Sequence, residues 1–164
     1  MAIIERHNLG IAAEFAVASE LCRRNIYAQL TLGTRKRTDL LVETKTGMLR
    51  IEIKAKQGPS WPNCKGIPSR QNRLLVLVDF ASKQENQRPD FYILTSEDWL
   101  NLVNKECEEK IAKGEVTLDD ENVPVWVNNV KYGQPYRGMG ISVRQVVAQK
   151  ERWDKIHDMT SIVQ

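Results

Sequence analysis

Residues 39–54, D-L-L-V-E-T-K-T-G-M-L-R-I-E-I-K, constrain the fold of this chain more than any other segment. Residues in the second half alternate with a period of two, the pattern of a strand that packs one face on a core. One face would hold Met48, Arg50, Glu52 and Lys54, and the other Leu49, Ile51 and Ile53. The alternation therefore predicts a strand with an acid and a base side by side on its polar face.

An upstream run, residues 39–43, leads into this strand through residues 44–47, which are typical of a hairpin turn. A two-residue turn leaves two registers open. Pairing 44 with 47 sets Asp39 opposite Glu52, and pairing 45 with 48 sets Asp39 opposite Lys54. Either register brings two carboxylates and an ammonium to one face, an arrangement that folding stability alone rarely requires.

A third acid lies on the first predicted helix, at about residues 10–24, which is rich in alanine and other strong helix formers. At about 100° per residue, Glu14 falls near the centre of the apolar stripe, and Glu20 falls on a flank. A core-facing carboxylate is costly unless a cation or a hydrogen-bond donor meets it. Two interpretations of Glu14 stay open: a structural partner inside the protein, or a role in a site.

The remaining pattern alternates strands and helices. Residues 25–32 are predicted as a short strand, 33–38 as a basic loop, and 57–69 as a long loop rich in proline and glycine. Residues 74–80 form an apolar run typical of a central strand, with 91–95 as its neighbour. Thr95 and Asp98 resemble a capping box that opens a helix closed by Gly114.

Residues 115–141 are predicted to be irregular or short-stranded, and Ser142 and Gln145 to cap a final helix through about residue 157. Three tryptophans are interpreted as core residues: Trp99, Trp126 and Trp153. At 164 residues the chain is of single-domain size. No segment reaches the roughly 20 apolar residues of a membrane span, and the N-terminus does not resemble a signal peptide, so a cytoplasmic location is expected.

The three cysteines are odd in number and widely spaced, so they indicate neither a disulfide framework nor a zinc site. The net charge of +3 permits a polyanionic partner. Basic residues flank the acids of the hairpin: Arg35, Lys36 and Arg37 before them, and Lys54, Lys56, Lys65, Arg70 and Arg73 after Glu52. Charge is therefore concentrated around the predicted site.

Converging carboxylates are the ligands that Mg²⁺ prefers, with waters and substrate phosphates completing the shell. Such an ion polarises a phosphoryl oxygen and lowers the pKa of a bound water. A lysine two residues from a ligand is placed to orient that water or to neutralise charge in the transition state. The set of Glu14, Asp39, Glu52 and Lys54 therefore favours phosphodiester hydrolysis.

The motifs Gly10-x-x-x-Glu14, Asp39 and Glu52-x-Lys54 resemble the PD-(D/E)XK nuclease superfamily, the fold shared by restriction endonucleases and archaeal Holliday-junction resolvases. Their order and spacing are similar to the resolvase-type branch over about residues 6–57, although Thr38 stands where the family name has proline. The resemblance implies an α/β fold with a restriction-endonuclease-like αβββαβ core and a mixed central sheet flanked by helices. One domain would span 1–164, with its core at about 6–112 and a C-terminal helical extension at about 113–164.

By the same resemblance Asp39 and Glu52 would be metal ligands, Lys54 the catalytic lysine, and Glu14 an accessory ligand, direct or through water. The implied cofactor is Mg²⁺, with Mn²⁺ as a substitute. The implied function is a divalent-metal-dependent deoxyribonuclease, of endonuclease or junction-resolving type, acting on DNA that includes branched forms. A homodimer is expected, since resolving enzymes act on two strands related by symmetry.

Two alternatives remain open at this stage. One is an inactive nuclease-fold module that binds nucleic acid or protein, and the other is an RNA-processing nuclease. Residues outside the acid and lysine set are expected to contact nucleic acid: Arg35, Lys36, Arg37, Lys56, Gln57 and Trp61. The three basic residues equally fit a solvated loop, and Trp61 either stacks on a base or pins its loop to the protein. Tyr132, Tyr136 and Arg137 fit a second nucleic-acid surface or a glycine-rich turn.

Overall fold

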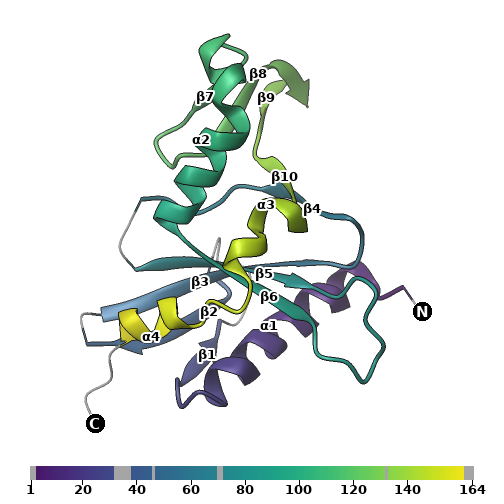
Figure 1. Cartoon of the computed structure of the whole chain (residues 1–164), viewed down its shortest axis with the longest axis vertical. Coiled ribbons are helices and arrows are strands. Elements are labelled where there is room, and N and C mark those ends of the chain that lie inside the picture. The colour runs from purple at the N-terminus through teal and green to yellow at the C-terminus, as the bar shows by residue number, and fades with distance from the viewer. Residues whose placement is uncertain (1–2, 32–37, 46, 70–71, 132, 161–164) are drawn as a thin grey trace.

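A computed structural model describes residues 3–31, 38–45, 47–69, 72–131 and 133–160. Its centre is a five-stranded sheet in the order β1-β2-β3-β5-β6 (Figure 1). The strands are β1 (Ala28–Leu30), β2 (Leu40–Thr44), β3 (Gly47–Lys56), β5 (Arg73–Asp79) and β6 (Asp90–Thr95). β3 and β5 run parallel, and the other neighbouring pairs are antiparallel. The predicted mixed α/β sheet is confirmed.

The β2–β3 hairpin adopts the first of the two predicted registers. Thr44 pairs with Gly47, and Leu40 pairs with Ile51. The backbone N–H of Asp39 donates at 2.9 Å to the carbonyl of Ile51, the residue that already pairs with Leu40. Asp39 therefore lies at the end of the hairpin, beside β3.

One face of the sheet is covered by α1 (Arg6–Cys22) and α4 (Asp154–Thr160), as Figure 1 shows. Alternate residues of the strands, among them Leu49, Ile51 and Ile53, pack there. α1 begins earlier than the predicted helix at 10–24. Glu5 is its N-cap and accepts hydrogen bonds from the N–H groups of His7 and Asn8, a local signal for a helix start.

The buried side of α1 differs from the predicted one. Glu20 is only 5% exposed, whereas Ile11 is exposed and Glu14 is half-buried. The predicted positions of Glu14 at the centre of the stripe and Glu20 on its flank were therefore wrong. Glu20 is tolerated inside because Arg24 and Arg88 both reach its carboxylate, at 2.6 Å and 2.8 Å.

The other face packs against α2 (Ser96–Ala112) and a two-stranded sheet of β4 (Ser60–Cys64) and β10 (Met139–Ser142). The prediction that 57–69 is a loop was wrong for residues 60–64, which form β4 because they pair with β10, far along the chain. Gly66 has a φ of +62°, and a side chain there would overlap the ring of Trp99. Glycine is thus required where this segment crosses α2.

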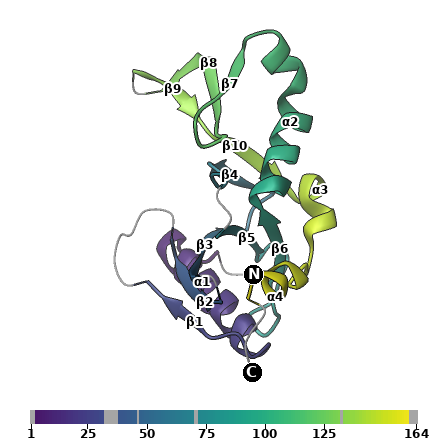
Figure 2. The same ribbon diagram turned by 90° about the vertical axis from the view of Figure 1, so that its left-hand side faces the viewer.

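A third sheet projects with α2 away from the central sheet (Figures 1 and 2). It contains β7 (Val116–Leu118), β8 (Pro124–Lys131) and β9 (Gln134–Arg137). Of the two possibilities predicted for residues 115–141, irregular or short-stranded, the structure has strands. Both predicted caps of α2 are present, at Thr95 with Asp98 and at Gly114. Trp99 and Trp153 are buried as predicted, and Trp126 is half-buried.

The predicted single C-terminal helix is broken into α3 (Val143–Val146), the 3₁₀ turn η1 (Val147–Gln149) and α4. Glu151 adopts a φ of +56° at the break, and its N–H donates to the carbonyl of Phe91 at 2.9 Å. The break lets Trp153 enter the core beside Phe91. Within the described residues, every helix is too short or too polar to cross a bilayer.

Candidate active site

Asp39 lies directly before β2, where the hairpin brings it beside β3. Its Oδ2 accepts a hydrogen bond from the backbone N–H of Ile53 at 2.6 Å, which orients the carboxylate. Burial raises the pKa of Asp39, and the charge of Glu52 adds to this effect. The Ile53 hydrogen bond and the charge of Lys54 oppose it. Asp39 is thus a half-buried acid held next to a second acid.

Glu52 and Lys54 extend from the same face of β3, as the alternation predicts. Lys54 Nζ lies 3.0 Å from Glu52 Oε1. The side chain of Glu52 is 5% exposed, and that of Lys54 is 39% exposed. The pair therefore has a buried acid and a lysine whose side chain is partly exposed.

Glu14 on α1 completes the predicted set. Burial raises the pKa of Glu14, and the negative charge of Asp39 raises it further, while His7 acts in the opposite sense. Because charges in water interact only over short distances, this coupling places Glu14 in the neighbourhood of Asp39. Three elements, α1, the start of β2, and β3, thus bring the four predicted residues to one region.

Cys64 at the end of β4 lies close enough for the charges of Glu52 and Lys54 to act on it. Burial raises the pKa of the Cys64 thiol to about 12. The thiol is therefore protonated at neutral pH, which disfavours a role as a nucleophile. Its Sγ donates to the carbonyl of Trp61 at 3.6 Å, a structural contact.

The acids fit a hard divalent cation better than a softer metal. Among the residues that the structure describes, no three His, Cys, Asp or Glu side chains form a ready-made metal group. Mg²⁺ is usually held by one or two carboxylates together with waters and substrate phosphates. Asp39, directly before β2, and Glu52, on β3, match such a partial set of oxygen ligands.

A groove of about 530 Å³ opens beside Lys54. The start of α1, the end of β3 and the strand β4 enclose it. Its lining includes Arg6, Gly10, Lys54, Gly58, Ser60 and Asn63. Tyr136 of β9 donates from its hydroxyl to Asn63 Oδ1 at 2.6 Å, so the projecting sheet supports the wall formed by β4.

Two predicted phosphate contacts have other partners. Lys56 Nζ lies 2.6 Å from Asp79 Oδ1, and its side chain is 3% exposed. Gln57 donates to the carbonyl of Ile4 at 2.6 Å and accepts from its N–H at 2.9 Å. The polar groups of both residues are therefore engaged in holding the fold, and the expectation that they contact phosphate is not met in this conformation.

Trp61 is fully buried, so its ring is not available to stack on a base. Its Nε1 donates to the carbonyl of Val78 at 3.0 Å, and its ring meets Tyr92 edge-on. This is the arrangement in which the tryptophan pins its segment to the protein. Tyr136 and Arg137 likewise bond Asn63 and Asp119. The predicted residues Arg35, Lys36, Arg37 and Tyr132 lie outside the described residues.

Arg6 is a groove residue that sequence reasoning missed. It is exposed at the start of α1 and has no ion pair within the described part of the chain. The only sequence signal was its position four residues before Gly10, on the same helix face. A single arginine at a helix start is too common to predict a binding residue from the sequence; the groove identifies it.

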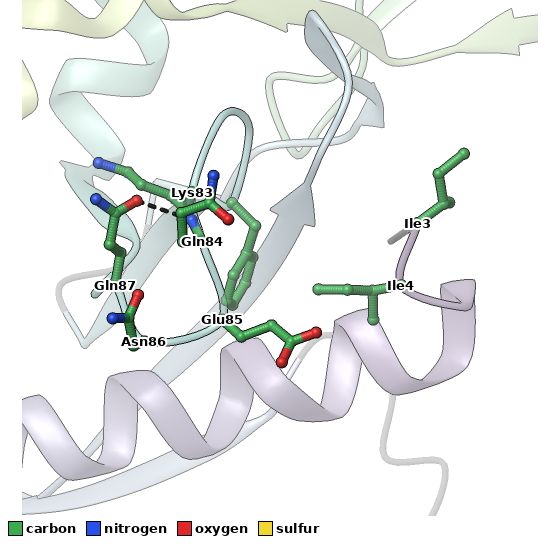
Figure 3. A pocket seen from close by; sticks show the side chains of 8 residues that line it. Ile3, Ile4, Lys83, Gln84, Glu85, Asn86 and Gln87 are labelled. Atoms are coloured by element: carbon green, nitrogen blue, oxygen red, sulfur yellow. Dashed lines mark hydrogen bonds between the residues drawn. The ribbon is translucent and has the colours of Figure 1, made fainter. Parts of the chain in front are cut away.

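A second cavity of about 570 Å³ lies between the N-terminal segment and the loop after β5 (Figure 3). Ile3, Ile4 and Phe80 provide its apolar part, and residues 83–87 its polar part. Lys83 is paired with Asp90 at 3.1 Å. No cluster of acids and bases comparable to that around Glu52 lines this cavity, so the site is assigned to the β2–β3 hairpin.

The fold and the site together define a mixed α/β protein with clustered acids and a lysine at one hairpin. No protein-family model matches the sequence, and no curated protein matches it. Among solved structures, one described as a bacterial homing endonuclease, I-Ssp6803I, is 16% identical over 56% of this chain and 69% of that chain, with a TM-score of 0.42. At this identity and TM-score the likeness assigns neither activity nor site residues to this chain.

Proposed function

We propose that the protein is a divalent-metal-dependent nuclease of the PD-(D/E)XK superfamily that hydrolyses phosphodiester bonds in DNA, as an endonuclease or a junction-resolving enzyme. One observation carries the proposal. The hairpin brings Asp39 beside β3, where the N–H of Ile53 donates to its carboxylate at 2.6 Å, and Lys54 Nζ lies 3.0 Å from Glu52. The charge coupling of Glu14 to Asp39 extends the same cluster.

Asp39 and Glu52 would hold Mg²⁺, for which Mn²⁺ would substitute. Such an ion, when bound, polarises a phosphoryl oxygen and lowers the pKa of a coordinated water. The Ile53 N–H keeps the Asp39 carboxylate in place, and Glu14 is available to accept a hydrogen bond from water or to serve as an outer ligand. Burial and like charge raise the pKa values of Asp39 and Glu14, so a nearby cation would favour the ionised form of both acids.

Lys54 would act on the substrate. Its side chain is partly exposed and lines the groove, where a phosphate would approach it. A cation at that position offsets the negative charge that develops on a phosphoryl group during attack by water. Glu52 holds the ammonium in place through the 3.0 Å ion pair.

A homodimer belongs to the same proposal, because a junction-resolving enzyme acts on two strands related by symmetry. A cytoplasmic location is proposed with it.

The decisive experiment uses purified protein with Mg²⁺ or Mn²⁺ and four substrates: supercoiled plasmid, a DNA hairpin, a four-way junction and a structured RNA. Cleavage of DNA is expected, with Glu52→Ala and Lys54→Ala inactive. Glu85→Ala, in an exposed loop at the other cavity, is the matched control and retains activity.

The other outcomes identify the alternatives. Cleavage of RNA alone would indicate an RNA-processing nuclease. Absence of cleavage, together with metal-independent binding that Glu52→Ala leaves unchanged, would indicate a binding module without catalysis. That module is favoured only by the lack of a three-ligand metal group among the described residues.

A further inference from the structure

Gly10 stands in the second turn of α1, where glycine is among the least favourable residues. A side chain added there would meet no atom within 4 Å, so internal packing does not require glycine. Its φ also lies outside the left-handed region that favours glycine. A bare backbone is useful where another chain must approach closely. The surface above Gly10 therefore has the shape of a contact point for a ligand.

Gly10 lies between two hollows. Arg6 and Gly10 line the groove beside Lys54. The same two residues also line a second hollow of about 460 Å³, which extends to Glu14. Arg6, Gly10 and Glu14 are spaced four residues apart, so they follow one line along the helix. The absence of a side chain at Gly10 leaves the rim between the two hollows low.

The groove has the charge and size for a single nucleic-acid strand. The accessible charged residues that line it are both basic, Arg6 and Lys54, while the ammonium of Lys56 is enclosed and paired with Asp79. Arg6 is exposed, and Asn63 and Ser60 add exposed polar groups on the opposite wall. A volume of about 530 Å³ is that of a small-ligand pocket, so the groove itself has room for about one or two nucleotides of one strand.

We propose that one unpaired DNA strand lies in this groove, with its backbone crossing α1 over Gly10 and a phosphate beside Arg6. This inference rests on the proposed nuclease function and narrows its substrate to DNA that offers an unpaired strand next to the cut: a single strand, a flap or an open junction. Arg6 serves as a binding residue, and Gly10 as a steric determinant of that path.

Binding is measured first in EDTA, by fluorescence anisotropy of a labelled 12-nucleotide single strand and of the blunt duplex with the same sequence. Gly10→Val is expected to weaken single-strand binding about ten-fold, and Gly10→Ala several-fold. Arg6→Ala should lower the slope of log K against log salt by about 0.7. Ser19→Val is the control, because Ser19 is exposed on the same helix and, at 100° per residue, points to the opposite side.

Thermal unfolding separates the binding role from a structural one. Gly10→Ala should raise the Tm, since alanine favours the helix, while it weakens binding. Cleavage in Mg²⁺ should be at least ten-fold faster on a flap or single strand than on the blunt duplex. Single-strand binding that is equal in wild type, Gly10→Ala and Gly10→Val, or tighter binding to the blunt duplex, would overturn the inference.

The two proposals fail separately. A protein that cuts blunt duplex as fast as a flap, with Gly10→Val unaffected, remains a nuclease but does not use this path. A protein that cuts nothing is not the proposed nuclease, and the EDTA binding series still decides whether a strand lies over Gly10.

Discussion

Lys54 and Lys56 extend from the same face of β3, two residues apart, yet only Lys56 is enclosed by the protein. Its ammonium lies 2.6 Å from Asp79 Oδ1 and 4.7 Å from the centre of the Trp61 ring. Lys54 keeps 39% of its side chain exposed beside Glu52. Neighbouring residues of one type therefore have different tasks: Lys56 joins β3 to β5, and Lys54 faces the groove.

Replacing each lysine by methionine should separate these tasks. Lys56→Met leaves the Asp79 carboxylate buried without its cation and should lower the free energy of unfolding by about 3–5 kcal/mol. Lys54→Met loosens a partly exposed pair and should cost about 1 kcal/mol, while nuclease activity falls at least about 100-fold. Urea denaturation and cleavage assays on both variants test this. Equal losses of stability would contradict the distinction.

Glu14→Gln should stabilise the protein in the absence of metal. Burial and Asp39 raise the folded-state pKa of Glu14, so the folded state loses stability as the pH rises from the ordinary value of 4.5 through the folded pKa. At pH 7 the variant avoids that loss and should gain about 0.5 kcal/mol, or about 1–2 °C in Tm. At pH 3 both proteins carry a neutral side chain, and the difference should vanish. A lower Tm for the variant at pH 7 would show that Glu14 has a stabilising partner.

Divalent metal should raise the Tm of the wild-type protein, because an ion that binds only the folded state stabilises it by mass action, by about 2.7 kcal/mol at 100 times its Kd. Asp39→Asn and Glu52→Gln should each remove most of this shift. Thermal scans with MgCl₂ or MnCl₂ are compared with NaCl at the same ionic strength. An undiminished shift in both variants would place the metal elsewhere.

Glu20→Gln should destabilise the protein at neutral pH. Hydrogen bonds from Arg88, followed by those from Arg24, hold the pKa of Glu20 at about 2, against burial, which acts in the opposite direction. This stabilisation is present above pH 4.5 and is lost as the pH falls toward 2. The variant should therefore have a free energy of unfolding about 2–3 kcal/mol lower than the wild type at pH 7, and almost the same near pH 2. Urea unfolding across this range measures it, with Glu85→Gln as an exposed control. A pH-independent difference would assign the effect to packing.

Local signals were sufficient for much of the fold. The period of two in β3 and the turn before it fixed the hairpin to two registers, and the structure has one of them. The capping pairs of Thr95 with Asp98 and of Ser142 with Gln145 mark real helix starts. These features depend on residues a few positions apart, so a single sequence contains them.

Features that depend on distant partners could not be predicted. Glu20 is buried because Arg88, 68 residues away, reaches it, and no helical periodicity contains that information. Residues 57–69 have the proline and glycine content of a loop, and residues 60–64 within them become the strand β4 only because β10 pairs with it. Lys56 appeared to be a phosphate contact because its partner Asp79 lies on another strand.

The pairing of β4 with β10 also sets an order for assembly during synthesis. The hairpin with Asp39, Glu52 and Lys54 leaves the ribosome long before residues 139–142, which complete the two-stranded sheet. Since nascent chains fold from the N-terminal side, β4, which forms one wall of the groove, is paired only after residues 139–142 have been synthesised. A translation product that stops before Met139 would carry every acid of the site but lack the strand that secures β4. Under the proposed nuclease function, such unfinished copies would therefore lack a complete groove and would not cut DNA.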